Sequence, residues 1–376
     1  MVVFGVAPTH AQQAAPPAPL SVVTGTVETP GKDRQLPIPG VMVTVHRVGS
    51  DSSGALDSAR SDAQGRYSLR YRRVGADDAI YFAAAIYRGI AYFSAPLKSA
   101  RATGEEGTIT VFDTTTRPVE FHVQGHHVVV STPHPDGVRD VVEVWELSND
   151  TTLTVVGRDS AAAVWTAPLP RGAANLAGGQ GDVAADALVA RGDHVALLAA
   201  FGPGVKQLSY SYTLPATSFP LTLSTERAAS VYEVLLEEPT AQLHGDALKR
   251  MAAATTQGRM FQRFLGQDVA KGTTIEIIVP ESAGASGRGA LIAIAVAIVL
   301  IMVGALGRAL VGRRAGVRAG AVAPVRSADS MLAAIALLDA RRERSDSTMD
   351  ESQYAAQRAA LKTQLAAALV AEGRAL

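Results

Sequence analysis

The sequence predicts a mostly β protein with two tandem β-sandwich domains, one transmembrane helix and a C-terminal α-helical hairpin. From residue 20 to residue 280, short segments with alternating apolar residues recur between turn residues, as in half-buried strands. Residues 289–307 (GALIAIAVAIVLIMVGALG) carry no charged side chain. After them, apolar residues recur at helical spacing. These three observations divide the chain into an exported β region, a membrane span and a helical tail.

The composition fits folded domains and excludes a nucleic-acid-binding protein. The 376 residues have a net charge of zero, 47% are hydrophobic and 19% are charged, so no basic surface for a nucleic acid is expected. The chain has no cysteine, which excludes disulfides and thiolate metal ligands. The stability of the domains must therefore come from burial.

The N-terminal residues 1–19 are interpreted as a partial signal peptide and a leader. Residues 1–7 (MVVFGVA) are apolar but short, and no basic segment precedes them, as in the second half of a signal peptide. A start codon further upstream would explain this pattern, and a disordered N-terminus is the alternative. Residues 12–19 (QQAAPPAP) are typical of a flexible leader.

Residues 20–115 are predicted to form the first β-sandwich. Segments such as VMVTVHRV and GRYSLRY alternate apolar and polar residues, which indicates antiparallel strands. Signatures at strand ends include residues 25–27 (GTV) and the motif Asp62-x-x-Gly65-x-Tyr67. In this motif Asp62 can accept backbone N–H groups, Gly65 can adopt a positive φ, and Tyr67 faces the core. Together these residues resemble the carboxypeptidase regulatory-like (transthyretin-like) domain, a seven-stranded sandwich.

The resemblance implies a fold and no peptidase activity, because the chain has no His-x-x-Glu motif for a catalytic zinc ion. Related β-sandwich families also include carbohydrate-binding-like members. Neighbouring aromatic residues could form such a binding surface, but adjacent residues of a strand face opposite sides. Core packing is therefore expected to account for at least half of them. These residues are Tyr81, Phe82, Tyr87, Tyr92 and Phe93.

Residues 116–280 are predicted to form a second, larger β-sandwich of about nine strands, with an insertion between residues 169 and 193. Within it, residues 171–182 (RGAANLAGGQGD) are interpreted as a loop, because they do not follow the phosphate-binding order G-x-x-x-x-G-K-[ST]. Residues 281–288 form a short tether. The sequence does not indicate a family for this domain.

The feature of the second domain that most strongly suggests a functional site is a group of four histidines within thirteen positions. Imidazole is a common metal ligand, and a hairpin across Gln124 and Gly125 could bring His122 and His127 onto one face. We nevertheless predict no metal site, because His126 and His127 would point to opposite faces and neither flanking carboxylate, Glu120 or Asp136, is fixed in place. The weak candidates for a metal site are His122, His127 and His134.

Residues 289–307 have the length of a membrane span. At about 1.5 Å per residue, a helix of this length reaches roughly 28 Å, close to the hydrocarbon thickness of a bilayer. A buried core helix is the alternative, but such helices rarely lack a polar face over this length. Arg288 precedes the stretch closely, whereas five arginines follow it up to residue 326. We therefore expect a transmembrane helix at residues 289–311. Because basic residues favour the cytoplasmic side, the β domains should be periplasmic or extracellular and the C-terminus cytoplasmic.

The tail is predicted to contain a basic linker at residues 312–326 and a helical hairpin at residues 327–376. The recurring Leu-Asp, Tyr and Leu-Lys positions in LLDARRERSDSTMDESQYAAQRAALKTQL resemble the SHOCT-like hairpins at the ends of bacterial membrane proteins. Small residues on one face of the span permit close contact with another helix, in a homodimer or with a membrane-protein partner. These residues are Ala290, Ala293, Ala297 and Gly304.

The expected function is that of a non-catalytic scaffold, receptor or assembly factor in the cytoplasmic membrane of a bacterium. We propose no catalytic residue, cofactor or nucleic-acid partner, because the chain has no G-x-S-x-G motif and no Ser with an identifiable His partner. Three alternatives stay open. They are a carbohydrate- or peptide-binding receptor acting through the first sandwich, a metal-dependent hydrolase using the histidine cluster, and an accessory factor of cytochrome c maturation, because similar tails also occur beside components of that process.

Overall fold

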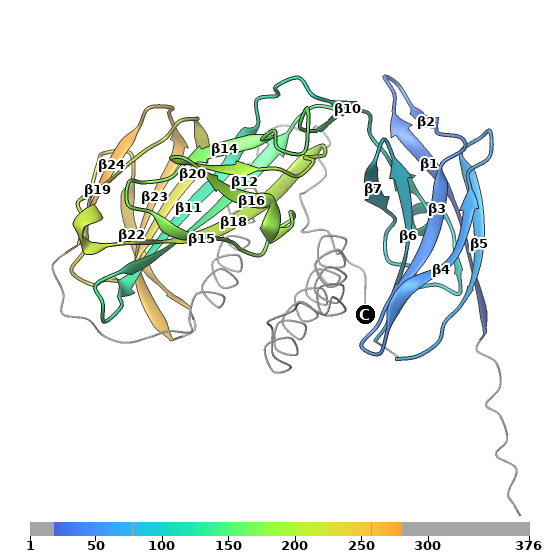
Figure 1. Cartoon of the computed structure of the whole chain (residues 1–376), viewed down its shortest axis with the longest axis horizontal. Coiled ribbons are helices and arrows are strands. Elements are labelled where there is room, and N and C mark those ends of the chain that lie inside the picture. The colour runs from blue at the N-terminus through green and yellow to red at the C-terminus, as the bar shows by residue number, and fades with distance from the viewer. Residues whose placement is uncertain (1–18, 77, 257, 280–376) are drawn as a thin grey trace, which may run out of the picture. The chain divides into compact units, whose positions relative to one another are not determined.

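The computed structural model describes residues 19–76, 78–256 and 258–279 (Figure 1). Its regular elements in this part are strands and three short 3-10 helices, which confirms the mostly β fold class. No helix of the described residues is long and apolar enough to cross a membrane. The predicted signal peptide, tether, membrane span, basic linker and helical hairpin lie outside the described residues.

The chain divides into two units, which we describe separately. Of the described residues, those up to Tyr87 and Ala91–Val111 belong to the first unit, and Arg88–Ile90 and those from Phe112 onward belong to the second. The change of unit at Val111 lies near the expected domain boundary at residue 115.

Two sheets form a β-sandwich in the first unit. In one sheet, β1 pairs antiparallel with β2 and β5 and parallel with β8 and β9. The other sheet has the order β4-β3-β6-β7, and apolar side chains of both sheets share one core. The strands are β1 (Leu20–Pro30), β2 (Gln35–Pro37), β3 (Met42–Val48), β4 (Ser53–Arg60), β5 (Arg66–Arg72), β6 (Ile80–Tyr87), β7 (Ile90–Phe93), β8 (Arg101–Ala102) and β9 (Ile109–Thr110).

A tight turn leads into β5 and contains the motif noted in the sequence. Oδ1 of Asp62 accepts hydrogen bonds from the backbone N–H groups of Gln64 and Arg66 at 2.9 and 2.8 Å. Gly65 has a φ of +73° in this turn, a conformation that favours glycine. Tyr67 is buried in the core of the unit. The structure thus confirms the roles predicted for the three motif residues.

The second unit is built on a seven-stranded sheet with the order β15-β18-β12-β11-β20-β23-β22. Neighbouring strands are antiparallel except for β11 and β20, which are parallel. Smaller sheets have the orders β14-β17-β16, β19-β24-β21 and β10-β13. The strands are β10 (Thr114–Thr115), β11 (His122–Pro133), β12 (Arg139–Asn149), β13 (Thr154–Val155), β14 (Trp165–Pro168), β15 (Ala174–Gly178), β16 (Leu188–Arg191), β17 (His194–Leu197), β18 (Gly204–Leu214), β19 (Leu221–Ser224), β20 (Ala229–Leu236), β21 (Gln242–His244), β22 (Lys249–Thr256), β23 (Arg259–Val269) and β24 (Thr274–Ile278).

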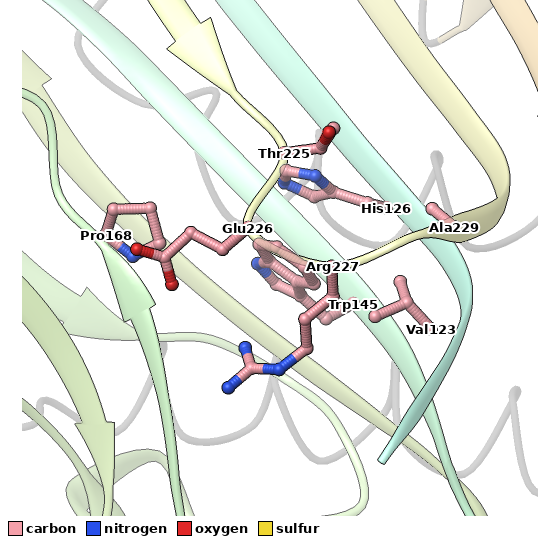
Figure 2. A pocket seen from close by; sticks show the side chains of 8 residues that line it. All are labelled: Val123, His126, Trp145, Pro168, Thr225, Glu226, Arg227 and Ala229. Carbon is pink, nitrogen blue, oxygen red and sulfur yellow. The ribbon is translucent and has the colours of Figure 1, made fainter. Parts of the chain in front are cut away.

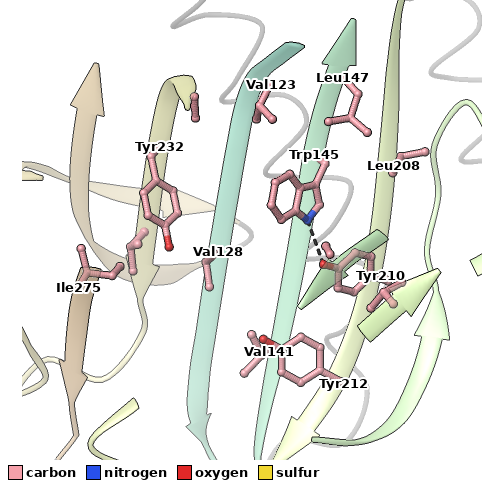
Figure 3. Packing of buried hydrophobic residues seen from close by; sticks show 14 of the residues in the cluster. Val123, Val128, Val141, Trp145, Leu147, Leu208, Tyr210, Tyr212, Tyr232 and Ile275 are labelled. Atoms are coloured by element: carbon pink, nitrogen blue, oxygen red, sulfur yellow. Dashed lines mark hydrogen bonds between the residues drawn. The ribbon is translucent and has the colours of Figure 1, made fainter. Parts of the chain in front are cut away.

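One face of the seven-stranded sheet shares its core with both three-stranded sheets (Figure 3). Val141 and Trp145 of β12 lie in this core, and the small sheets contribute Leu197 of β17 and Ile277 of β24. Because side chains alternate between the two faces of a strand, the same period places Glu143 on this apolar face. The carboxylate of Glu143 therefore lies inside the apolar core of the unit.

The interpretation of residues 171–182 as a loop is wrong for residues 174–178. Ala174–Gly178 forms β15, which pairs with β18 at one edge of the seven-stranded sheet. The expected insertion between residues 169 and 193 also contains β16, which belongs to a three-stranded sheet. An edge strand is held by backbone hydrogen bonds on one side and needs little apolar sequence. The Gly-rich segment therefore has no apolar pattern from which this strand could be predicted.

Candidate functional site

The candidate site is organised on β11, the central strand of the seven-stranded sheet. The predicted hairpin across Gln124 and Gly125 is wrong, because His122–Pro133 forms one strand. The pairing of β11 with β12 instead shifts register between Val123 and Gly125, which is a β-bulge. The chain continues through these residues because β12 and β20 supply partners on both sides of β11.

His126 and His127 point to opposite faces of the sheet, as their adjacent positions predicted. His126 is 8% exposed and stacks on the core residue Trp145. On the other face, Nδ1 of His127 lies 2.8 Å from Oε2 of Glu233, and Arg263 donates to the second oxygen of that carboxylate. Burial alone would raise the pKa of Glu233, but His127 and Arg263 lower it below its ordinary value.

Glu143 is the acceptor of a buried hydrogen-bond network. It is 3% exposed, and its Oε2 accepts hydrogen bonds from Nε2 of His126 at 2.8 Å, from the hydroxyl of Tyr210 at 3.0 Å and from Nε1 of Trp145 at 3.2 Å. Its Oε1 accepts a hydrogen bond from the hydroxyl of Tyr212 at 2.8 Å. These donors replace the water that a buried carboxylate loses.

The two tyrosines of the network remain protonated donors. Burial raises the pKa of Tyr210 and Tyr212 well above the ordinary value, and the nearby carboxylate of Glu143 raises both pKa values further. Nε1 of Trp145 also lies 2.9 Å from the hydroxyl oxygen of Tyr210 (Figure 3). The hydroxyl groups are therefore fixed toward the carboxylate.

His126 is a neutral imidazole held between two aromatic rings. Its ring centroid lies 3.5 Å from that of Trp145 and 4.8 Å from that of Tyr232, with interplanar angles of 17° and 6°. Burial lowers the pKa of His126 and outweighs the hydrogen bond to Glu143, which acts in the opposite direction. Because the carboxylate accepts from Nε2, the proton of the neutral ring lies on Nε2. Nδ1 is left as an acceptor, and no residue of the described ranges hydrogen bonds to it.

A small pocket opens over His126 and Trp145 (Figure 2). Val123, Pro168 and Ala229 supply apolar walls. The open volume of about 280 Å³ includes solvent at the mouth, and the enclosed part has room for about one water molecule. The pocket thus opens the largely buried side chains of His126 and Trp145 to the surface of the unit.

The connection between β19 and β20 forms the rim of the pocket through Thr225, Glu226 and Arg227 (Figure 2). Oγ1 of Thr225 donates to a backbone oxygen of the turn after β23 at 2.8 Å. Nη1 of Arg227 donates to the backbone oxygen of Thr166 in β14 at 3.0 Å. Glu226 between them is exposed. These contacts tie the rim to two neighbouring parts of the unit.

The hydroxyl group in the pocket lining is not hydrogen bonded to a base within the described residues. Thr225 contributes a hydroxyl group to the pocket lining, but this hydroxyl donates to the backbone. A nucleophile in a triad would instead be hydrogen bonded to the base. The carboxylate of Glu143 is engaged by four side chains. The hydrogen-bonding group of the site without a partner in the described residues is the lone pair on Nδ1 of His126.

The three weak metal candidates do not meet in one site. Nε2 of His122 lies 3.1 Å from the hydroxyl of Ser230, and Nε2 of His134 lies 2.6 Å from Oδ2 of Asp140. His127 is engaged on the second face of the sheet. Within residues 19–76, 78–256 and 258–279, no group of three His, Cys, Asp or Glu side chains is arranged for a metal ion.

The aromatic cluster of the first unit divides between the two faces of its sheet. Tyr81 lies in the core, whereas Phe82 lies on the outer face and contacts Phe93 edge-on, with ring centroids 5.6 Å apart. Phe93 is 40% exposed, and Ile86 of the same face is 67% exposed. This outer face is a second candidate binding surface. Tyr87 and Tyr92 are partly buried against the core.

No protein-family model matches the sequence, and neither does any curated protein. Among solved structures, a 9R-lipoxygenase from Cyanothece PCC8801 is similar to 28% of the chain, with 16% sequence identity and a TM-score of 0.18. The match covers 18% of the lipoxygenase chain. A similarity of this extent carries no argument about function.

Proposed function

We propose that this chain is a non-catalytic receptor or scaffold of the bacterial envelope, and that its second β unit binds a ligand or partner at the pocket over His126. The observation that carries this proposal is the unpartnered Nδ1 of a residue that is more than nine-tenths buried and lines a surface pocket. Nδ1 is not among the buried atoms that lack a hydrogen-bond partner, so solvent reaches it, and a ligand that supplies a donor can take the place of water there.

The rigidity of the site supports recognition. The ring of His126 is fixed by two stacking partners and one hydrogen bond. A group fixed in this way loses little freedom when a ligand binds. The rim is tied by Arg227, so the mouth is also preorganised.

This function is tested by comparing how much partner is captured when the mouth of the pocket is open and when a substitution blocks it. A tagged full-length chain is captured from membranes in mild detergent, and the proteins and small molecules that accompany it are identified by mass spectrometry. Glu226→Trp places a large side chain at the exposed rim and should remove the bound species. Ala228→Trp is the matched control, because Ala228 is exposed on the same connection. Equal recovery with both variants would contradict the proposal.

We further propose that residues 289–311 anchor the chain in the cytoplasmic membrane, with the β units outside and residues 327–376 inside. The excess of arginine after the apolar stretch supports this orientation. Protease added to intact spheroplasts should digest the β units and spare a tag at the C-terminus. Digestion of that tag alone would show that the chain has the opposite orientation.

A second candidate function is peptide or carbohydrate binding by the outer face of the first unit. It is favoured by Phe93 and Ile86, because large exposed apolar side chains on one face are typical of interaction sites. Phe93→Ser together with Ile86→Ser should abolish capture of the partner if this face is the binding site. If the pocket is the site, the double variant should leave capture unchanged.

A further inference from the structure

We infer that the pocket selects a neutral hydroxyl group on a short aliphatic carrier, with the hydroxyl entering the enclosed part and its O–H donating to Nδ1 of His126. This inference rests on the proposed binding function and adds the chemistry of the ligand. It concerns the group that enters the pocket, and the rest of the ligand lies outside.

The first step of the argument is the polarity of the floor. Nε2 of His126 donates to Glu143 at 2.8 Å, so only Nδ1 can face a ligand. A neutral imidazole has one donor and one acceptor, and the donor is already used. A ligand that offers only an acceptor would therefore meet the lone pair of Nδ1, whereas a donor is complementary to it.

The second step concerns the walls. The ring of Trp145 and the side chains of Val123, Pro168 and Ala229 line the pocket around His126. Apolar walls with one polar group are typical of sites that hold an apolar body in a fixed orientation. A hydroxyl on a short aliphatic group satisfies both features, because its carbon atoms pack on the walls while its O–H reaches the floor.

The third step concerns charge and size. The rim carries both Glu226 and Arg227, whose opposite charges favour neither a cationic nor an anionic ligand. The enclosed space is about that of one water molecule, which a hydroxyl group matches and a planar amide exceeds. A neutral hydroxyl is thus the donor that best fits this pocket.

The test compares two probes that differ by one hydroxyl group. N-acetyl-threonine-N-methylamide and N-acetyl-valine-N-methylamide have nearly the same shape, and each is titrated into the full-length chain in detergent. Nitrogen NMR of labelled histidine follows Nδ1 of His126, which is identified by its contact with the ring protons of Trp145. We expect the threonine probe to shift this nitrogen and to bind about ten-fold more tightly than the valine probe.

Different failures separate this inference from the proposed function. Equal binding of the two probes, or binding of the threonine probe without a shift of Nδ1, would refute the selection of a hydroxyl group and leave the pocket as a binding site. Binding of neither probe would also refute it. If, in addition, Glu226→Trp leaves capture of the partner unchanged, the proposed function fails as well. Glu226→Trp should abolish binding of the threonine probe, and Ala228→Trp should retain it.

Discussion

Nε2 of His126 and Oε2 of Glu143 lie 2.8 Å apart inside the apolar core of the second unit. The contact joins neighbouring antiparallel strands, because His126 of β11 is opposite Trp145 of β12 and Val128 is opposite Glu143. It links a pocket-lining ring to a carboxylate that side chains of neighbouring strands hold in place. The stability of the unit and the tautomer of the ring therefore depend on the same hydrogen bond.

Glu143→Gln should destabilise the second unit by about 3 kcal/mol, because an amide NH₂ would oppose donors that now meet a carboxylate oxygen. Both tryptophans of the chain, Trp145 and Trp165, are buried in this unit. Their fluorescence during urea unfolding of the full-length chain therefore reports on it. Glu146→Gln in the same strand is the control, since Glu146 is only half-buried, and it should change the unfolding free energy by less than about 1 kcal/mol. Similar losses in both variants would contradict the assigned role of the network.

The second unit should lose stability as the pH falls from 6.5 to 5. Burial lowers the pKa of His126 in the folded protein below its ordinary value of 6.5, so the unfolded chain binds the proton first. The contribution of neutral His126 to the unfolding free energy is complete above pH 6.5 and is lost below it. The unfolding free energy then falls by up to about 1.4 kcal/mol per pH unit. His126→Phe should reduce this slope, and His122→Phe, at an exposed position, should not. An unchanged slope in His126→Phe would show that another group causes the loss.

Arg263→Met should reduce stability at pH 7 by about 2 kcal/mol, because it leaves the buried carboxylate of Glu233 with only His127 as a partner. The folded-state pKa of Glu233 is below its ordinary value of 4.5 despite burial, which opposes the lowering. Its contribution is therefore present above pH 4.5 and is lost as the pH falls further. The variant should show a shallower loss in that acidic range. Arg250→Met, at an exposed position of β22, should leave both the stability and the acid slope unchanged.

Alternation of apolar residues predicted the strands whose side chains fill the cores. The segment VMVTVHRV corresponds to β3, in which every second residue from Val43 to Arg47 is buried, and DVVEVWEL corresponds to β12, which is buried on both faces. β22 (Lys249–Thr256) was not predicted, because it is largely exposed at the edge of the sheet and is held by backbone hydrogen bonds to β23. Such pairing leaves no pattern in composition.

The candidate site was predicted only in part. The histidines of β11 were noted, and their opposite orientations followed from the period of a strand. Glu143 was missed, although its position between Val141 and Trp145 in the inward phase of β12 is a visible sign of a buried carboxylate. Tyr210 and Tyr212 could not be assigned to it, because they lie on β18, and the register that brings Tyr210 opposite Glu143 is set by the sheet. That register is a tertiary property and has no local signal.

Gly25 should be the position of the first unit that least tolerates a larger residue. A Cβ atom at Gly25 would lie 1.8 Å from the backbone oxygen of Gly107, and this oxygen also accepts a 2.6 Å hydrogen bond from the hydroxyl of Tyr67. The backbone of β1 and the turn at Gly107 would have to separate, which would weaken the adjacent β1–β9 pairing. We therefore expect Gly25→Ala to destabilise the first unit by about 3 kcal/mol or more.

The matched control for this prediction is Gly54→Ala in β4, where no heavy atom lies within 4 Å of the added Cβ. Because both tryptophans lie in the second unit, hydrogen exchange followed by mass spectrometry is the suitable measurement. In Gly25→Ala, peptides from β1, β5 and β9 should exchange about one hundred-fold faster than in the wild type, since exchange through unfolding follows the free energy lost. Peptides from the second unit should keep their rates, because Gly25 and the displaced turn belong to the first unit alone. Equal rates in the Gly25 and Gly54 variants would mean that the turn at Gly107 yields without disturbing β1, and the close approach would then have no role in stability.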